Sequence, residues 1–234
     1  MCFLFHGQSG GKLKSNSTVK NTTLFVVRHG ETEWNRQGLL QGHLDSPLSE
    51  LGVNQANALS EYFTKCKWDM IVSSDLNRAV RTSKIIKGAS GQKLLTDSRL
   101  RERDLGVAQG LTIKDFAEKY PEESIKFSEG SEDYVIPGGE SICQRYNRSI
   151  ACIREYAELY EGRNIIIVTH GGVLDGVFRF VAKMPLSQSR TFSLFNASVN
   201  TIQIQDGLWN IVTWGYVEHL RALGSLDDWY RGVI

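Results

Sequence analysis

Two histidines follow short apolar segments of the chain, and a glycine follows each of them. His29 comes after TLFVV and an arginine, and His170 comes after NIIIV and a threonine. Imidazole can act as a nucleophile at neutral pH, and a glycine lets a ligand approach the backbone closely. A single histidine in an apolar setting is more often a hydrogen-bonded core residue. Two of them, each following a strand, favour a reactive site.

Two arginines accompany these histidines. Arg28 directly precedes His29, and Arg78 follows the apolar run at residues 70–72 through SSDLNR. An arginine beside a buried strand end needs an anion as its partner. A guanidinium binds phosphate through two parallel hydrogen bonds, and a phosphoryl group spreads its charge over three oxygens. Two arginines and two imidazoles therefore indicate a pocket for a phosphoryl group.

The elements that must position these side chains alternate between strands and helices. Runs rich in β-branched residues predict strands over residues 23–27, 70–72 and 164–168. Apolar residues at helical spacing predict helices over residues 49–65, 75–87, 112–121, 140–160 and 173–182. Ser49 is expected to cap the first helix, and Gly88 to follow the second. This alternation indicates an α/β fold, a three-layer sandwich in which helices flank a mainly parallel sheet.

A hairpin is predicted near the C-terminus. Residues 199–205 and 209–214 flank an Asp-Gly dipeptide, which is typical of a tight hairpin turn, so an antiparallel strand should join the sheet. Ligands of open α/β sheets bind beyond the carboxyl ends of the strands. The site is therefore expected just after Val27, Val72 and Val168.

The composition argues against several classes of protein. The 234 residues include 27 Lys plus Arg and 26 Asp plus Glu, a formal net charge of +1. Near neutrality argues against nucleic acid or a membrane surface as a partner, since both select a basic excess. Four cysteines without a CxxC pair fit neither a disulfide scaffold nor a structural zinc site, and they favour a reducing, cytoplasmic setting.

The first 22 residues differ in composition from the rest of the chain. They hold three lysines and no acidic residue, and their apolar start is shorter than the roughly 7–15 residues of a signal-peptide core. We expect a flexible leader over residues 1–22, followed by a single domain over residues 23–234. A transit peptide stays open as an alternative, although such peptides are rich in arginine and this segment has none.

Several longer strings, in this order, resemble the signature blocks of one known family. They are VVRHGETEWN (26–35), QGHLDSPLSELGVNQA (41–56), SSDLNRAVRTS (73–83), LRERDLGVAQG (100–110), PGGES (137–141) and VTHGG (168–172). Together they resemble the histidine phosphatase, or phosphoglycerate mutase-like, superfamily, over about Thr23 to Leu220. RHG alone would be a weak signal, whereas the ordered set of blocks is specific.

The resemblance implies a role for each matching residue. His29 would be the nucleophile that takes the phosphoryl group as phosphohistidine, and Glu102 would protonate the leaving oxygen and then act as a base towards water. Arg28, Arg78 and His170 would bind and neutralise the phosphoryl oxygens as part of the catalytic set. The substrate-binding set would comprise Arg28, Asn35, Gln41, Arg78, His170 and Gly171.

The chemistry expected of Glu102 agrees with that role. An alkoxide is a poor leaving group, so protonation by a carboxylic acid accelerates its departure by about 10²–10⁴-fold. The like charge of a nearby phosphate should raise the pKa of Glu102. The alternative for this residue is a surface salt bridge with Arg101 or Arg103.

The same family includes phosphatases and mutases, and the mutases usually carry an insertion between the acid block and the second histidine block. Here that segment is compact, which favours a phosphatase of small phosphorylated metabolites such as phosphoserine, phosphoglycerate or sugar phosphates. No metal or other cofactor is expected, because the arginines supply the charge stabilisation. A phosphoglycerate mutase that depends on 2,3-bisphosphoglycerate remains the alternative, and a catalytically silent phosphate-binding module a remote one. A homodimer also stays open.

Residues 115–133 concentrate negative charge, with seven acidic residues against Lys119 and Lys126. One interpretation is a solvated helical surface. The other is a flap at the mouth of the site that disfavours bisphosphates, with Trp34, Phe127 and Tyr134 adding apolar contacts or simply filling the core.

Overall fold

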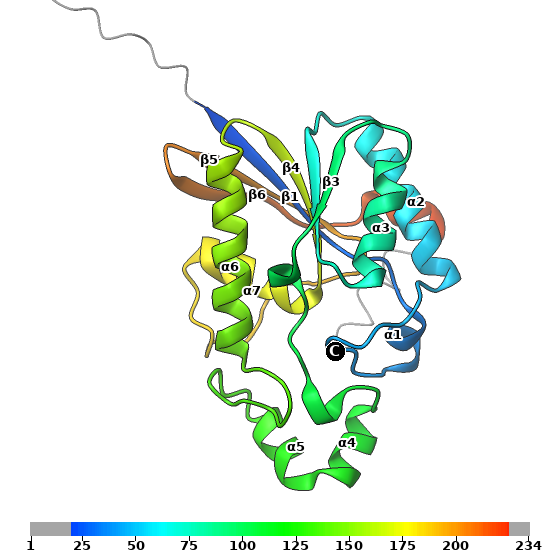
Figure 1. Ribbon diagram of the computed structural model, residues 1–234, viewed down its shortest axis with the longest axis vertical. Coiled ribbons are helices and arrows are strands. Elements are labelled where there is room, and N and C mark those ends of the chain that lie inside the picture. The colour runs from blue at the N-terminus through cyan, green and yellow to red at the C-terminus, as the bar shows by residue number, and fades with distance from the viewer. Residues whose placement is uncertain (1–19, 225–234) are drawn as a thin grey trace, which may run out of the picture.

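The structure, a computed structural model, describes residues 20–224 and centres on a six-stranded sheet (Figure 1). Its strands are β1 (Asn21–Arg28), β2 (Met70–Ser73), β3 (Lys93–Thr96), β4 (Asn164–Thr169), β5 (Val199–Gln205) and β6 (Leu208–Tyr216). Their order is β3-β2-β4-β1-β5-β6. The first four in that order are parallel, whereas β5 and β6 are antiparallel to their neighbours. The mainly parallel sheet and the hairpin are both confirmed, and β5 is the strand that runs against the parallel set.

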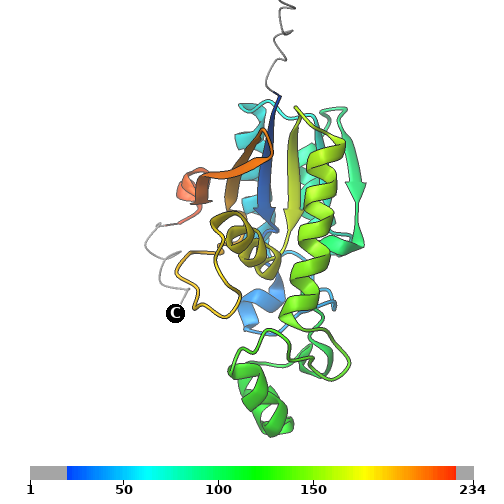
Figure 2. The same cartoon turned by 90° about the vertical axis from the view of Figure 1, so that its left-hand side faces the viewer.

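Helices cover both faces of the sheet, because alternate side chains of the buried strands point to opposite faces. In β4, Ile165 and Ile167 belong to one apolar cluster, and Ile166 and Val168 belong to another. The helices that complete these clusters are α6 (Ile142–Leu159) and α7 (Gly171–Ala182) on the first face, and α2 (Glu50–Thr64) and α3 (Asn77–Lys87) on the second. The sandwich of three layers is therefore confirmed (Figures 1 and 2).

Two further helices form a small lobe beyond the carboxyl edge of the parallel strands (Figure 1). They are α4 (Ile113–Lys119) and α5 (Pro121–Ser128), and Phe116 is buried between them and the chain that enters the lobe. The Thr112 hydroxyl caps α4 by accepting a hydrogen bond from the Asp115 amide at 3.0 Å. Pro121 ends α4 as predicted but also begins α5, since the first helical position needs no N–H donor.

Most predicted elements are present with shifted ends. Ser49 caps α2 and Gly88 follows α3, as expected, but α3 begins at Asn77 rather than at residue 75. Helix α7 begins at Gly171, directly after His170, rather than at residue 173. Three elements were not predicted from the sequence, namely α1 (Glu33–Gln37), α5 and β3, because elements this short or this exposed show too little periodicity.

The N-terminal boundary also needs a correction. Strand β1 begins at Asn21, so residues 21 and 22 belong to the sheet and not to a leader. The rest of the predicted leader, up to residue 19, lies outside the described residues. In the part of the chain that the structure covers, no helix combines the length and the apolar character needed to cross a membrane.

Candidate active site

The two predicted histidines meet at the carboxyl edge of the sheet. Arg28 and Thr169 are paired in register at the ends of β1 and β4, so the residues that follow them leave the sheet side by side. The rings of His29 and His170 lie with their centroids 5.1 Å apart and their planes at 60°. Both side chains are almost fully buried. Adjacent parallel strands thus bring together two residues that are far apart in sequence.

The hydrogen bond of His29 determines which ring nitrogen carries its hydrogen. Its Nδ1 lies 2.7 Å from the carbonyl oxygen of Gly30, which can only accept, so Nδ1 is the donor. Burial lowers the pKa of His29 well below the usual value, and the charges of Arg78 and Arg28 lower it further. The ring is therefore neutral at physiological pH, with an unprotonated Nε2.

His170 is held by Arg78 and Ser74. The Nε of Arg78 donates to His170 Nδ1 at 3.3 Å, which leaves the hydrogen on Nε2, and Nε2 donates to the Ser74 hydroxyl at 2.8 Å. The pKa of His170 is lowered well below its usual value by burial and then by the charge of Arg78. Arg78 itself is anchored at 2.7 Å by the carbonyl of Gly42 and pairs with Asp45 at 3.0 Å.

Arg28 is a buried cation with spare hydrogen-bonding capacity. One terminal nitrogen donates to the carbonyl of Leu194, whereas its Nε is buried without a partner among the described residues. Burial is the main reason that the pKa of Arg28 falls to about 10. Gly171 lies against this side chain, since a Cβ at that position would be 3.4 Å from the Arg28 guanidinium carbon, an ordinary van der Waals contact. The two residues therefore form one surface beside His29.

Glu102 also reaches this edge of the sheet. Its carboxylate accepts hydrogen bonds of 2.8 Å from the backbone amides of Arg103 and Gly172, the latter in the first turn of α7. Neither neighbouring arginine pairs with it: Arg101 binds Asp75, and the guanidinium of Arg103 donates to backbone carbonyls. The alternative of a surface salt bridge is therefore wrong.

The pKa of Glu102 is shifted downward, whereas a rise was expected. Burial raises the pKa of Glu102. The charge of Arg145 and the hydrogen bonds from Gly172 and Arg103 together lower it by more than burial raises it, so the net shift is downward. The positive end of α7 favours the charged form in the same way. The expected rise depended on the negative charge of a phosphate, whereas the surroundings that the chain itself provides stabilise the carboxylate.

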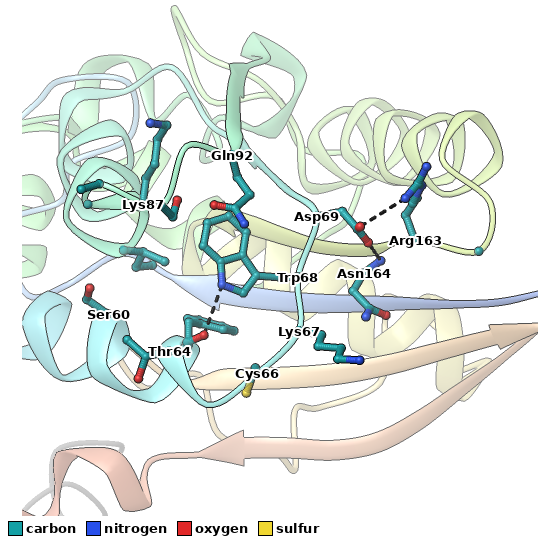
Figure 3. Close-up of a pocket in the computed structure, with 16 residues that line it drawn as sticks. Ser60, Thr64, Cys66, Lys67, Trp68, Asp69, Lys87, Gln92, Arg163 and Asn164 are labelled. Carbon is teal, nitrogen blue, oxygen red and sulfur yellow. Dashed lines mark hydrogen bonds and ion pairs between the residues drawn. The ribbon is translucent and has the colours of Figure 1, made fainter.

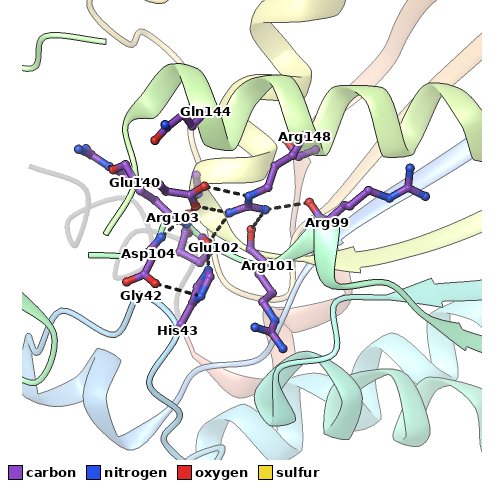
Figure 4. Close-up of polar contacts among 12 residues, drawn as sticks. Gly42, His43, Arg99, Arg101, Glu102, Arg103, Asp104, Glu140, Gln144 and Arg148 are labelled. Atoms are coloured by element: carbon purple, nitrogen blue, oxygen red, sulfur yellow. Dashed lines mark hydrogen bonds and ion pairs between the residues drawn. The ribbon is translucent and has the colours of Figure 1, made fainter. Parts of the chain in front are cut away.

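The backbone around Glu102 is clamped by polar side chains (Figure 4). Arg148 donates to the carbonyl oxygens of Arg99, Arg101 and Glu102 at 2.8, 2.7 and 2.7 Å, and it forms an ion pair with Glu140. The same Glu102 carbonyl lies 2.9 Å from Nε2 of His43, on its other side. The loop that carries Glu102 is thus held from two directions.

We expect the Arg148→Met substitution to loosen this loop. Removing the guanidinium leaves the largely buried Glu140 carboxylate and three carbonyls without their donor, which should cost about 2–4 kcal/mol of unfolding free energy. The value of kcat should fall more than KM rises, because Glu102 loses its position rather than its charge. Urea unfolding and steady-state kinetics measure both effects. Arg154→Met, at an exposed position of the same helix, is the matched control. Unchanged stability and kcat would rule out the clamp.

A cavity of about 770 Å³ opens beside these groups. Seven of the eight residues of the predicted site line it: Arg28, His29, Asn35, Gln41, Arg78, Glu102 and Gly171. His170 is not part of the lining, but it contacts both His29 and Arg78. Asn35 mainly caps α1, where its oxygen accepts from the Thr32 amide at 3.2 Å. Gln41 has a buried side-chain oxygen without a partner among the described residues. The structure thus brings all the predicted residues to one place.

A larger hollow, of about 850 Å³, lies at the opposite edge of the sheet (Figure 3). Its lining includes Asp69 and Asn164, at the amino ends of β2 and β4, and Trp68, whose indole nitrogen donates to the Phe63 carbonyl at 3.2 Å. It contains no histidine and none of the predicted site residues. The size of this hollow alone therefore does not make it a candidate for phosphoryl chemistry.

Several charged residues of the site were not predicted from the sequence. Arg103, Arg145, Asp175, Arg179 and Arg190 also line the cavity beside His29. Arg145 had a detectable signal, because it falls on the apolar face of the helix predicted over residues 140–160, where a cation is out of place. Phe127 lines the cavity as one interpretation anticipated, whereas Trp34 and Tyr134 do not.

Comparisons with known proteins agree with this geometry. Residues 24–217 match the profile of the "Histidine phosphatase superfamily (branch 1)". The chain is 38% identical over 218 residues to phosphoglycerate mutase-like protein 4 of Arabidopsis thaliana, covering 92% of this chain and 94% of the relative. It is 38% identical over 214 residues to a metal-independent phosphoserine phosphatase of the same plant, covering 90% of this chain and 88% of the relative. The solved structure of Bacillus stearothermophilus YhfR superposes with a TM-score of 0.81 at 30% identity, covering 85% of this chain and 99% of YhfR. From its fold, the order of its sequence blocks and these likenesses, the chain belongs to the histidine phosphatase superfamily.

Proposed function

We propose that this protein is a phosphomonoesterase that hydrolyses small phosphorylated metabolites, without a metal, through a phosphohistidine intermediate on His29. The observation that carries the proposal is the tautomer of His29. Its Nδ1 donates to the Gly30 carbonyl, and this leaves a basic Nε2 in a neutral ring beside two buried arginines. A neutral imidazole in a cationic pocket is suited to attack a phosphoryl group.

In the first step, Nε2 of His29 forms a bond to phosphorus while the bond from phosphorus to the ester oxygen breaks. Arg28 and Arg78 neutralise the charge on the equatorial oxygens, and Glu102 donates a proton to the departing alcohol oxygen. Glu102 acquires that proton as the phosphoryl group binds, because the like charge opposes the downward pKa shift set by the chain.

In the second step, water attacks the phosphohistidine. Glu102, now a carboxylate, takes a proton from the water as the new phosphorus–oxygen bond forms and the bond to His29 Nε2 breaks. Inorganic phosphate leaves, and the neutral histidine is restored with its Nδ1 still bound to the Gly30 carbonyl. No metal is required for either step, since the arginines supply the positive charge.

The remaining expectations are part of the same proposal. The phosphoserine phosphatase activity and metal independence named for the plant relative support a small phosphomonoester and the absence of a metal requirement. We retain a cytoplasmic location, no nucleic-acid or membrane partner, and a homodimer as an open alternative. The acidic segment 115–133, which forms most of α4 and α5, is proposed to disfavour bisphosphates at the mouth of the cavity, where Phe127 lies.

A panel of phosphomonoesters tests this function. Phosphoserine, 3-phosphoglycerate and a sugar phosphate should release inorganic phosphate at rates that EDTA does not change. A strict need for a divalent metal would overturn the mechanism. The plant relative named phosphoglycerate mutase-like makes the mutase the second candidate. Interconversion of 2- and 3-phosphoglycerate that needs 2,3-bisphosphoglycerate and releases no phosphate would establish that alternative instead.

A further inference from the structure

Arg145, in α6, is a buried cation that has no hydrogen bond to a carboxylate among the described residues. Only 3% of the residue is exposed, and its Nη1 has no partner among the described residues. Its one ion pair among the described residues is a long one, 4.0 Å from Nη2 to a carboxylate oxygen of Asp175. The same oxygen lies closer to Arg179, 2.9 Å from its Nε. Burying a charge is costly unless a well-placed counter-charge and hydrogen bonds accompany it.

The position of Arg145 relates it to Glu102. A Cβ placed on Gly172 would lie 2.2 Å from an oxygen of Glu102 and 3.3 Å from Nη1 of Arg145, so both groups border the same glycine. Both residues line the cavity beside His29. Glu102 is proposed to protonate the leaving oxygen. Arg145 therefore lies on the side of the cavity that the alcohol portion of the substrate occupies.

The charge of the cavity lining also favours a ligand with a negative group besides the phosphoryl group. The lining contains six arginines but only two carboxylates, Glu102 and Asp175. A phosphoryl group beside Arg28 and Arg78 offsets only part of this excess. Leu105, Phe127 and Ile142 provide apolar wall in the same cavity and no counter-charge. A second negative group on the ligand would complete the balance.

We propose that Arg145 determines substrate specificity by binding a carboxylate carried on the alcohol portion of the phosphomonoester. This inference rests on the proposed function for the orientation of the substrate. A planar guanidinium matches a carboxylate through two parallel hydrogen bonds, which a hydroxyl or a hydrogen in the same place cannot replace. The favoured substrates are then phosphorylated hydroxycarboxylic acids, rather than sugar or polyol phosphates of similar size.

Two pairs of ligands isolate the carboxylate. 3-Phosphoglycerate differs from glycerol 3-phosphate, and phosphoserine from phosphoethanolamine, only at the position of the carboxylate. Binding of each ligand is measured by calorimetry in the His29→Ala background, so that no turnover is needed. Hydrolysis by the wild-type chain is measured in parallel. The dissociation constants should favour the carboxylate member of each pair by about 10–100-fold, the range expected for a charged hydrogen-bonded pair.

The Arg145→Gln substitution should bring both ratios close to one, and Arg145→Lys should retain part of the preference. Arg154→Gln, at an exposed position of the same helix, should leave the ratios unchanged. Equal binding of both members of a pair to the His29→Ala chain overturns the inference, and so does a ratio that survives Arg145→Gln. A binding preference that persists without any hydrolysis by the wild-type chain overturns the proposed phosphatase function but supports the role of Arg145. Tighter binding of 2,3-bisphosphoglycerate than of 3-phosphoglycerate would assign Arg145 to a second phosphate instead.

Discussion

Replacing His29 with alanine should lower phosphatase activity by on the order of 10⁴–10⁶-fold, as expected when the nucleophile of a covalent mechanism is removed. The reason is that the described residues place no second free ring nitrogen beside Arg28 and Arg78: both nitrogens of His170 are engaged, one by Arg78 and one by Ser74. Steady-state release of phosphate from phosphoserine measures the loss.

His219→Ala is the matched control for this substitution. His219 is also largely buried, but it donates to the carbonyl of Ala197 at 3.0 Å and does not line the cavity. Its replacement should affect thermal stability and leave the rate nearly unchanged. Rapid acid quenching of the wild-type chain with ³²P-labelled substrate should trap an acid-labile phosphoenzyme that the His29→Ala chain does not form. Substantial activity in that chain, or a missing phosphoenzyme, would refute covalent catalysis at His29.

The Glu102→Gln substitution should have the second-largest effect. An amide keeps the size of the side chain but can neither donate the proton to an alkoxide nor accept one from water. The rate with phosphoserine should therefore fall by about 10²–10⁴-fold. With p-nitrophenyl phosphate, whose leaving group needs no protonation, phosphorylation of His29 should stay fast and hydrolysis of the intermediate should become limiting.

The two substrates make this prediction specific. The Glu102→Gln chain should release a burst of about one p-nitrophenolate per site and then turn over slowly, whereas phosphoserine should give no burst. Equal losses with both substrates and no burst would show that Glu102 only supports the local structure. Glu158→Gln provides a comparison, because that carboxylate is exposed on α6 and does not line the cavity.

The pH dependence should have a defined direction. The pKa of His29 is shifted well below its usual value, so the neutral nucleophile persists as the pH falls through 6.5. The proton on Glu102 is lost as the pH rises, because its surroundings favour the carboxylate. The rate with phosphoserine should therefore decline towards alkaline pH, and the rate of phosphorylation by p-nitrophenyl phosphate should not. A decline between pH 7 and 5 that follows the ionisation of a histidine would contradict the neutral state of His29.

Much of the fold follows from local features of the sequence. The apolar runs that form β1 and β4 are uninterrupted, and the Asp-Gly pair adopts the left-handed turn that a tight hairpin requires, with φ values of 50° at Asp206 and 77° at Gly207. Strand β3 escaped prediction because its four residues lie at the edge of the sheet and are half exposed, so no hydrophobic pattern marks it. Hydrophobic periodicity reflects the burial of alternate side chains, and a short edge strand buries too few side chains to show it.

The sequence by itself determined which residues follow the apolar strands. The positions of Arg28, His29 and His170 at or directly after strand ends, and of Arg78 a few residues after β2, are local features of the chain. Only the tertiary structure decided how they act. The Gly30 carbonyl selects the tautomer of His29, and the amide of Gly172, 70 residues away, holds Glu102 ionised. Arg145 becomes a buried cation whose Nη1 has no hydrogen-bond partner among the described residues only when α6 packs beside α7. Hydrogen bonds and burial of this kind depend on contacts between distant segments, and no local pattern of residues encodes their geometry.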